Sequence, residues 1–258
     1  MTDIISDVII HTGNILKHNH AKRYFSKNAL STSGHKNREL ETALENQVFK
    51  PDEKCTWNHL ELPTENSNDD FKSVHAEENE ISISTKIFLS ADSKPDVIRQ
   101  AVDQLKSKLD LGARFKINIL ILSFPKNFEI EKMVTFYKAA EKLVESGDIC
   151  HIGTADLCLV QLKNLGEQIG TTPDVIQIDY TGHWYDCNSA LVKYAAEKDM
   201  LTLIHTDCTP FITSSRINEI TGSDCVKAVD AVIRYAVTAK TRSVLLAKGY
   251  FLFLEKDK

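Results

Sequence analysis

The sequence predicts an α/β protein of the (β/α)8, TIM-barrel-like type, and three observations predict it. Between residues 149 and 207, the short apolar runs ICHIGTADL, PDVIQIDY and LTLIHTD alternate with segments of helical apolar spacing. This is the pattern of parallel strands buried beneath covering helices. The length of 258 residues suits one barrel, which takes about 250 residues. No GxGxxG motif follows a predicted strand, so an open dinucleotide-binding sheet is disfavoured.

The first third of the chain gives weak signals for secondary structure. A short strand is expected at 7–13, and a helix at 38–48, where apolar residues recur at helical spacing. The stretches 17–36 and 50–79 are rich in polar residues and are predicted to be irregular, mobile loops. The second of them contains at most one short strand, near 56–60. A catalytic loop of an ancestral enzyme could have been lost there.

From residue 80 onward the signals are stronger. Pro95 is expected in the first turn of a helix, and Gly147 is expected to stop the next helix. Asp224 lies near the predicted start of a late helix, and the last strand runs into a hairpin. The remaining elements are expected as a strand at 81–89, a helix at 95–111, a strand at 116–124, a helix at 131–145, a loop at 211–222, a helix at 224–240 and a strand at 243–254. Residues 1–258 are predicted to form a single barrel domain.

Composition excludes several classes of protein. The formal net charge is -5 and Lys and Glu are mixed along the predicted helices, which argues against a nucleic-acid-binding surface. No apolar run reaches the 18 or so residues of a membrane span, and the first residues, MTDIISDVII, lack the pattern of a secretory signal. The six cysteines form no CxxC pair. We therefore expect a cytoplasmic protein with free thiols.

Metal and nucleotide signatures are also missing from the sequence. His151, His183 and His205 fall in separate predicted loops without ligand spacing, which favours rim or surface histidines over a metal site. The sequence has no P-loop motif. We expect no metal and no cofactor of this chain's own.

Several segments carry a family resemblance. HIGTADLCLVQL, PDVIQIDY and LTLIHTD resemble the corresponding loops of the aldo-keto reductase superfamily, where an IGVSNF-like turn is followed by an NQVE-like strand. HTGNIL at 11–16, IGTADL at 152–157 and IRYAVTAKTRSVLLAKGYFL at 233–252 more closely resemble the regulatory (modifier) subunits of glutamate–cysteine ligase. These three segments span nearly the whole chain. The resemblance implies an aldo-keto-reductase-type barrel with irregular N-terminal loops and a truncated C-terminal end.

The catalytic assembly of the superfamily is largely absent by this resemblance. Carbonyl reduction there needs a Tyr acid, a Lys that lowers the pKa of that Tyr, a supporting Asp and a His. Lys86 stands in the place of the Lys and Ser123 in the place of the His. The Tyr and the Asp have no counterpart. Lys86 and Ser123 are therefore interpreted as vestigial positions, and a packed strand-end lysine is an equally good interpretation of Lys86.

The cofactor positions are depleted as well. Gln177 matches a Gln that would bind a nicotinamide carboxamide, although it can equally satisfy backbone groups at the barrel mouth. Ala155 and Asp156 replace a Ser–Asn pair, and His205 or Thr206 stands where an aromatic ring would stack on the nicotinamide. Of the segment that would clamp the adenosine phosphate, only Lys248 remains. The resemblance implies no tight NADP binding, with Gln177 and Lys248 as vestigial positions.

Four residues in predicted loops are candidates for an interface or a redox role. Trp184 and Tyr185 could anchor a partner, because aromatic side chains give large contact area at low entropic cost, or could pack onto the rim. Cys187 and Cys208 could form an intersubunit or mixed disulfide.

The resemblance implies a non-catalytic regulatory subunit and not an enzyme. Such a subunit forms a heterodimer with the glutamate–cysteine ligase catalytic subunit, raises its effective affinity for glutamate and relieves feedback inhibition by glutathione. ATP and Mg²⁺ would belong to the partner. The alternative is a divergent NADPH-dependent aldo-keto reductase that uses Lys86 with an acid from 50–79, Tyr24, Tyr180 or Tyr185. A scaffold for another partner also stays open.

Overall fold

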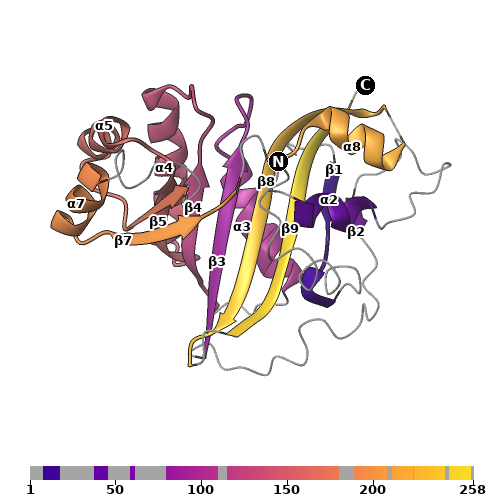
Figure 1. Ribbon diagram of the computed structural model, residues 1–258, viewed down its shortest axis with the longest axis horizontal. Coiled ribbons are helices and arrows are strands. Elements are labelled where there is room, and N and C mark those ends of the chain that lie inside the picture. The colour runs from indigo at the N-terminus through magenta and orange to yellow at the C-terminus, as the bar shows by residue number, and fades with distance from the viewer. Residues whose placement is uncertain are drawn as a thin grey trace. The chain divides into compact units, whose positions relative to one another are not determined.

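The computed structural model describes residues 8–17, 38–45, 59–61, 80–109, 115–179, 189–207, 211–222, 224–241 and 244–256. The chain divides into two compact units, which are described separately (Figure 1). Unit 1 comprises Met1–Ser82 and Cys208–Lys258, and unit 2 comprises Ile83–Asp207. The predicted single domain over 1–258 stays a prediction.

Unit 2 contains a parallel sheet in which each strand pairs with the next one along the chain. The central strands carry near-continuous apolar runs, such as INILILS, because helices and neighbouring strands cover them. Ile81 and Ser82, at the start of the first strand, belong to unit 1. The strands are β3 (Ile81–Leu89), β4 (Ile117–Ser123), β5 (Ile149–Ala155), β6 (Val175–Asp179) and β7 (Leu201–His205).

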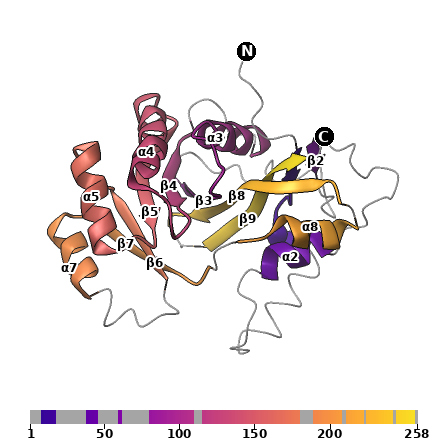
Figure 2. The same ribbon diagram turned by 90° about the horizontal axis from the view of Figure 1, so that it is seen from above.

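The helices of unit 2 alternate with these strands and pack against one another in chain order. Figure 2 shows α3, α4 and α5 along one side of β3, β4 and β5. Their buried residues recur at helical spacing, as in Met133, Phe136, Tyr137, Ala140 and Leu143. The helices are α3 (Val97–Lys108), α4 (Ile130–Glu145), α5 (Leu159–Ile169) and α7 (Ser189–Glu197).

The predicted stop of α4 is confirmed. The backbone of Gly147 has φ +77°, a left-handed conformation that glycine adopts without steric cost. Its N–H donates to the Val144 carbonyl. The chain therefore turns directly from α4 into β5.

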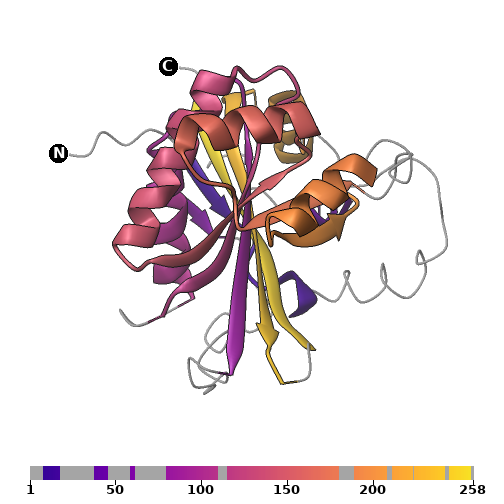
Figure 3. The ribbon, with the colours of Figure 1, turned by 90° about the vertical axis from the view of Figure 1, so that its left-hand side faces the viewer.

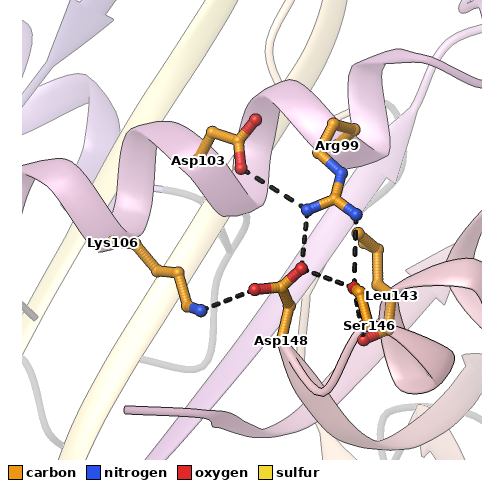
Figure 4. Close-up of polar contacts among 6 residues, drawn as sticks. All are labelled: Arg99, Asp103, Lys106, Leu143, Ser146 and Asp148. Carbon is orange, nitrogen blue, oxygen red and sulfur yellow. Dashed lines mark hydrogen bonds and ion pairs between the residues drawn. The ribbon is translucent and has the colours of Figure 1, made fainter. Parts of the chain in front are cut away.

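An ion-pair cluster fixes this turn to the neighbouring helix (Figure 4). The Asp148 carboxylate accepts hydrogen bonds from Arg99 at 2.6 Å and Lys106 at 2.7 Å, both on α3, and from the Ser146 hydroxyl at 2.6 Å. Burial alone raises the pKa of Asp148, but these donors outweigh it and hold the pKa well below its usual range. The cluster therefore stabilises the ionised carboxylate in the folded state.

Unit 1 is built around a long antiparallel hairpin. Figure 3 shows its two yellow strands, β8 (Val226–Ala239) and β9 (Val244–Lys256), side by side. Strand β1 (Val8–His11) pairs with β9 in the antiparallel sense and with β2 (His59–Glu61) in the parallel sense. The short 3-10 turn η1 (Ile15–Lys17) follows β1. Strands from both ends of the sequence thus share one sheet.

The helix predicted at 224–240 is wrong, because β8 occupies this segment. Val226, Val229, Ile233 and Ala236 follow a helical spacing, and Asp224 precedes them as a residue type that often caps helices. The segment instead pairs with β9 along nearly its whole length, and its β-branched residues favour a strand. Tertiary pairing overrode the local pattern.

The loop predicted at 211–222 is also wrong, because it contains helix α8 (Ser214–Thr221). The Thr213 hydroxyl accepts a hydrogen bond from the Arg216 N–H, which caps the first turn. Gly222 ends the helix in the left-handed conformation, at φ +63°. The small polar residues that suggested a loop are capping residues.

Helix α2 (Arg38–Glu45), within the predicted 38–48 helix, packs against α8. Leu40, Ala43 and Leu44 are buried. On its polar side, Glu41 and Glu45 pair with Arg216 of α8. The helix is thus held by an apolar face and by charge complementarity.

The α/β class, with its parallel strand–helix units, is confirmed. Neither unit closes into a barrel within the described part of the chain, since the last strand of unit 2, β7, pairs there only with β6. Apart from Lys17 and β2, the predicted loops 17–36 and 50–79 lie outside the described residues. No described helix is long and apolar enough to cross a membrane.

Candidate functional site

The candidate site lies at the carboxyl ends of the strands of unit 2. Ser123 of β4, Ala155 of β5 and Gln177 of β6 are in register. Lys86 of β3 pairs with Ile121, two residues before Ser123, so Lys86 and Ser123 point to the same face of the sheet. Three of the predicted positions, Lys86, Ser123 and Gln177, are therefore brought together on one face.

Lys86 is buried inside this unit. Its side chain is 3 % exposed, and Nζ lies 3.0 Å from Oδ2 of Asp207, which follows β7. Nζ also lies 4.8 Å from the centre of the Phe88 ring, within cation–π range. Strand β3 continues to Leu89, so Lys86 is not an exposed strand end. Its charge is compensated by a carboxylate from the far strand of the unit.

His205 extends this ion pair. Its ring is 4 % exposed, whereas Thr206 is exposed. Nε2 lies 2.8 Å from Oδ1 of Asp156, and an ionised carboxylate only accepts hydrogen bonds, so Nε2 carries a proton. Nδ1 lies 3.2 Å from Oδ2 of Asp207 and 3.0 Å from the Asp207 backbone N–H. Both ring nitrogens are thus engaged.

Asp156 is held in an unusual conformation to make this contact. Its backbone has φ +61°, in the left-handed region that Asp and Asn enter more readily than most residues. Its N–H donates to the Gln177 carbonyl, and its Oδ1 also accepts the Asp179 N–H at 3.0 Å. The turn after β5 is therefore fixed to the end of β6.

Two carboxylates set the protonation of His205. Burial lowers the pKa of the ring, and the Lys86 charge lowers it further. Hydrogen bonds to Asp156 and Asp207, with the charge of Asp156, outweigh both and raise the pKa of His205 above its ordinary value. When His205 is protonated, the strand-end network of Lys86, Asp207, His205 and Asp156 contains two cations and two anions. Its net charge is then zero.

Gln177 has a buried acceptor that no described residue uses. The residue is 8 % exposed, and its Oε1 has no hydrogen-bond partner among the described residues. Ser123, which is in register with Gln177 but separated from it by Ala155 of β5, is 2 % exposed. A small donor group could be received there. Within the described ranges, no group of His, Cys, Asp and Glu side chains has the arrangement of a metal site.

The two terminal sequence motifs meet in unit 1. The HTGNIL loop and the AKGY strand exchange hydrogen bonds. The Tyr250 N–H donates to the Thr12 hydroxyl, the Lys248 N–H to Asn14 Oδ1, and the Tyr235 hydroxyl to the Gly13 carbonyl. A Cβ on Gly249 would lie 2.2 Å from the Gly13 oxygen, so only glycine fits. These motifs act as a structural staple.

Lys248 belongs to this staple and not to the strand-end site of unit 2. Its ammonium group pairs with Glu39 of α2, which also accepts a hydrogen bond from the Tyr250 hydroxyl at 2.9 Å. A phosphate at Lys248 would have to compete with Glu39. The vestigial cofactor role of Lys248 stays a prediction.

The remaining candidates lie outside the described residues. These are Cys187, Cys208, Trp184 and Tyr185. Among the described cysteines, Cys150 and Cys158 have free thiols. The predicted interface and redox roles stay predictions.

Asp207 is the residue that the sequence did not assign. Its position directly after the LTLIHT strand was visible, but the missing partner of Lys86 was sought in 50–79. The contact between Lys86 of β3 and Asp207 after β7 depends on how the sheet curves. The apolar pattern of a single strand carries no information on that curvature. A carboxylate at a strand end was the only available signal.

The fold and this site define an α/β protein of parallel strand–helix units, with strand-end charges that compensate one another. Comparison with curated proteins gives a more specific likeness. The chain is similar to the glutamate–cysteine ligase regulatory subunit of Mus musculus, at 26 % identity over 210 residues, covering 77 % of this chain and 72 % of that protein. The Homo sapiens regulatory subunit is 25 % identical over 188 residues, which cover 68 % of this chain and 67 % of that protein.

Further comparisons give weaker or partial matches. A putative glutamate–cysteine ligase regulatory subunit of Schizosaccharomyces pombe is 25 % identical over 48 % of the chain and 45 % of that protein. No family model matches. Among solved structures, the aldose reductase of Schistosoma japonicum aligns at a TM-score of 0.41 and 19 % identity, over 64 % of this chain and 51 % of that chain. An aldo/keto reductase of Brucella melitensis aligns at a TM-score of 0.38 and 22 % identity, over 45 % of this chain and 43 % of that chain.

Proposed function

We propose that the chain is a non-catalytic regulatory subunit of glutamate–cysteine ligase. It binds the catalytic subunit in the cytoplasm as a one-to-one heterodimer, raises its effective affinity for glutamate and relieves feedback inhibition by glutathione. The reaction it regulates is the first step of glutathione biosynthesis. The observation that carries the proposal is the similarity to mammalian regulatory subunits over 77 % of the chain.

The strand-end site supports a role without turnover. Lys86 is compensated by Asp207, and His205 is held between Asp156 and Asp207. An Asp supports the catalytic Lys of the superfamily as well, so the support for a role without turnover lies in the missing counterpart of the Tyr acid. ATP, Mg²⁺ and the chemistry belong to the partner under this proposal, and the chain carries no cofactor.

Regulation then takes the form of thermodynamic linkage. The chain binds more tightly to the conformation of the catalytic subunit that has high affinity for glutamate and low affinity for glutathione. Glutamate must in turn tighten the heterodimer by the same factor. Coupling of this kind is typically worth about 1–3 kcal/mol, or roughly 5-fold to 150-fold in affinity.

Complex formation is the first test. The purified chain is mixed with the catalytic subunit from the same organism, and the mass of the product is measured by size-exclusion chromatography with light scattering. A one-to-one complex that glutamate tightens is expected. Two separate peaks at concentrations well above those in the cell would contradict the proposal.

Trp184, Tyr185, Cys187 and Cys208 are proposed contributors to the heterodimer. If Cys187 or Cys208 forms an intersubunit disulfide, replacing it with Ser lowers the sensitivity of the holoenzyme to oxidants. Unchanged sensitivity in both variants removes the redox role. Replacing Trp184 and Tyr185 together with Ala should weaken the complex without unfolding the chain.

A second candidate, a divergent NADPH-dependent aldo-keto reductase, is favoured by one observation. Gln177 Oε1 is buried without a partner among the described residues and could receive a donor from a bound molecule. Quenching of NADPH fluorescence, followed by turnover of a reactive aldehyde, tests this candidate. Saturable binding with turnover would replace the regulatory proposal, and neither is expected.

A further inference from the structure

His205 is the only titratable side chain of the strand-end network with a conventional pKa near neutrality. It lies at the end of β7, two residues before the last residue of unit 2, Asp207. The backbone that follows Asp207 begins the second segment of unit 1. Any change at Asp207 therefore acts where the chain passes from one unit to the other.

The Nδ1 atom of His205 has two competing partners on the same residue. The backbone N–H of Asp207 lies 3.0 Å from Nδ1, and Oδ2 of the Asp207 side chain lies 3.2 Å from it. A neutral ring with its proton on Nε2 accepts the backbone N–H at Nδ1. A protonated ring carries hydrogen on Nδ1, so it donates to Oδ2 and can no longer accept the N–H.

Nε2 does not change its partner in this exchange. It donates to Oδ1 of Asp156 in both protonation states. Asp156 is itself fixed by the Asp179 N–H and by its bond to the Gln177 carbonyl. The ring is therefore anchored on one side, and protonation changes only the contact with Asp207.

The charged groups around the ring permit either state. Asp156 follows β5, Asp179 ends β6, Lys86 projects from β3, and Asp207 follows β7. Lys86 pairs with the same Oδ2 of Asp207 that faces Nδ1. When His205 is protonated, Oδ2 of Asp207 faces two cations, Lys86 and His205. When His205 loses the proton, Oδ2 faces the cation of Lys86 alone.

We propose that His205 is a pH-sensitive switch within unit 2 that exchanges the partner of Nδ1 between the Asp207 backbone and the Asp207 carboxylate. The exchange follows the gain and loss of the Nδ1 proton as the pH changes. The inference goes beyond the proposed regulatory function and does not depend on a partner chain.

The experiment follows His205 and the Asp207 amide by NMR in the full-length chain. The state of each ring nitrogen is read from long-range ¹H–¹⁵N spectra across a pH titration. Protection of the Asp207 amide from hydrogen exchange, corrected for intrinsic rates, is measured over the same range. The Asp207 amide should become more protected as pH rises, with the same midpoint as the loss of the proton from Nδ1.

Three variants test the cause. His205→Gln should abolish the pH dependence of the Asp207 protection. His151→Gln, which changes a histidine that is 59 % exposed beside Asp174, should leave it intact. Asp156→Asn keeps an acceptor for Nε2, tolerates the left-handed backbone and removes one charge, so it should lower the midpoint by about one pH unit or more.

Two results would overturn the switch. One is a titration of His205 that the Asp207 amide does not follow. The other is an unchanged midpoint in Asp156→Asn, which stays informative if His205→Gln fails to fold.

Discussion

Two buried polar networks in the described part of the chain differ in the groups that build them. The staple of unit 1 joins HTGNIL to AKGY and to Tyr235 of β8 through backbone groups and the uncharged side chains of Thr12, Asn14 and Tyr235, with the Lys248–Glu39 ion pair beside them. The strand-end network of unit 2 joins Lys86, Asp207, His205 and Asp156 through charges. Hydrogen bonds between uncharged groups keep their geometry at any ordinary pH. The charged network depends on its partners and on protonation, so it is the one that can respond.

Removing one partner of the charged network is expected to have the largest effect. Asp207→Ala takes away the carboxylate that compensates buried Lys86 and contacts His205. Breaking a buried pair on one side costs about 3–5 kcal/mol. The free energy of unfolding, from urea denaturation followed by circular dichroism, measures the loss.

The double variant Lys86→Met with Asp207→Leu is the matched control. It removes both charges and keeps the volume apolar, so it should recover most of the lost stability. If it is as unstable as Asp207→Ala, the loss comes from something other than an uncompensated charge.

The neutral staple should be sensitive to shape instead of charge. In Gly249→Ala the new Cβ would lie 2.2 Å from the Gly13 carbonyl and 2.5 Å from the Tyr235 hydroxyl, and rigid backbone lies on one side. Overpacking of this kind costs about 1–3 kcal/mol, and we expect the upper end. The midpoint of urea unfolding gives the value.

Gly170→Ala separates crowding from backbone strain. Gly170 has φ +78° and no heavy atom near the added Cβ, so its substitution costs only the left-handed conformation, about 1 kcal/mol. Equal losses at Gly249 and Gly170 would show that the staple is not closely packed.

The ion-pair cluster around Asp148 (Figure 4) is partly exposed, so removing its carboxylate should cost less stability than either Asp207→Ala or Gly249→Ala. The Asp148 side chain is 21 % exposed. Asp148→Asn should destabilise the chain by about 1–2 kcal/mol at neutral pH, because charge-assisted bonds to Arg99 and Lys106 are lost.

The effect of Asp148 has a definite pH dependence. Its pKa is lower in the folded chain than the ordinary value of 3.8, so the unfolded state binds the proton more tightly. The stabilisation is therefore complete above 3.8 and is lost as pH falls below 3.8 toward the folded pKa. Urea unfolding at a series of pH values should show a difference between wild type and Asp148→Asn that shrinks in acid.

Asp103→Ala is the control with the smallest expected effect. Asp103 is 61 % exposed and lies 3.7 Å from the same Arg99. An exposed pair of this kind contributes at most about 0.5–1 kcal/mol. A loss as large as that of Asp148→Asn would mean that the cluster does not depend on Asp148.

Prediction from the sequence succeeded where local patterns and tertiary contacts agree. The apolar runs of β4 and β5 and the stop at Gly147 were found because burial and glycine conformation leave local traces. Strand β8 was missed because Val226–Ala239 also fits a helical spacing, and only its pairing with β9 decides the conformation. Helix α8 was missed because Thr213 and Gly222 were taken for loop residues and are its caps.

For the site too, positions on single strands could be predicted, whereas contacts between distant strands could not. The family resemblance singled out Lys86, Ser123 and Gln177, and the structure brings them to one face of unit 2. Asp207 as the partner of Lys86 depends on how the ends of β3 and β7 approach across three intervening strands. No spacing in the sequence encodes that approach.

The central claim is that this chain regulates a ligase and has no turnover of its own. The most direct measurement is the glutamate KM of the glutamate–cysteine ligase catalytic subunit, with and without one equivalent of the chain, at several glutathione concentrations. The account predicts a KM lower by about 5-fold or more and weaker inhibition by glutathione. A KM and a glutathione inhibition that both stay unchanged at saturating chain would contradict it.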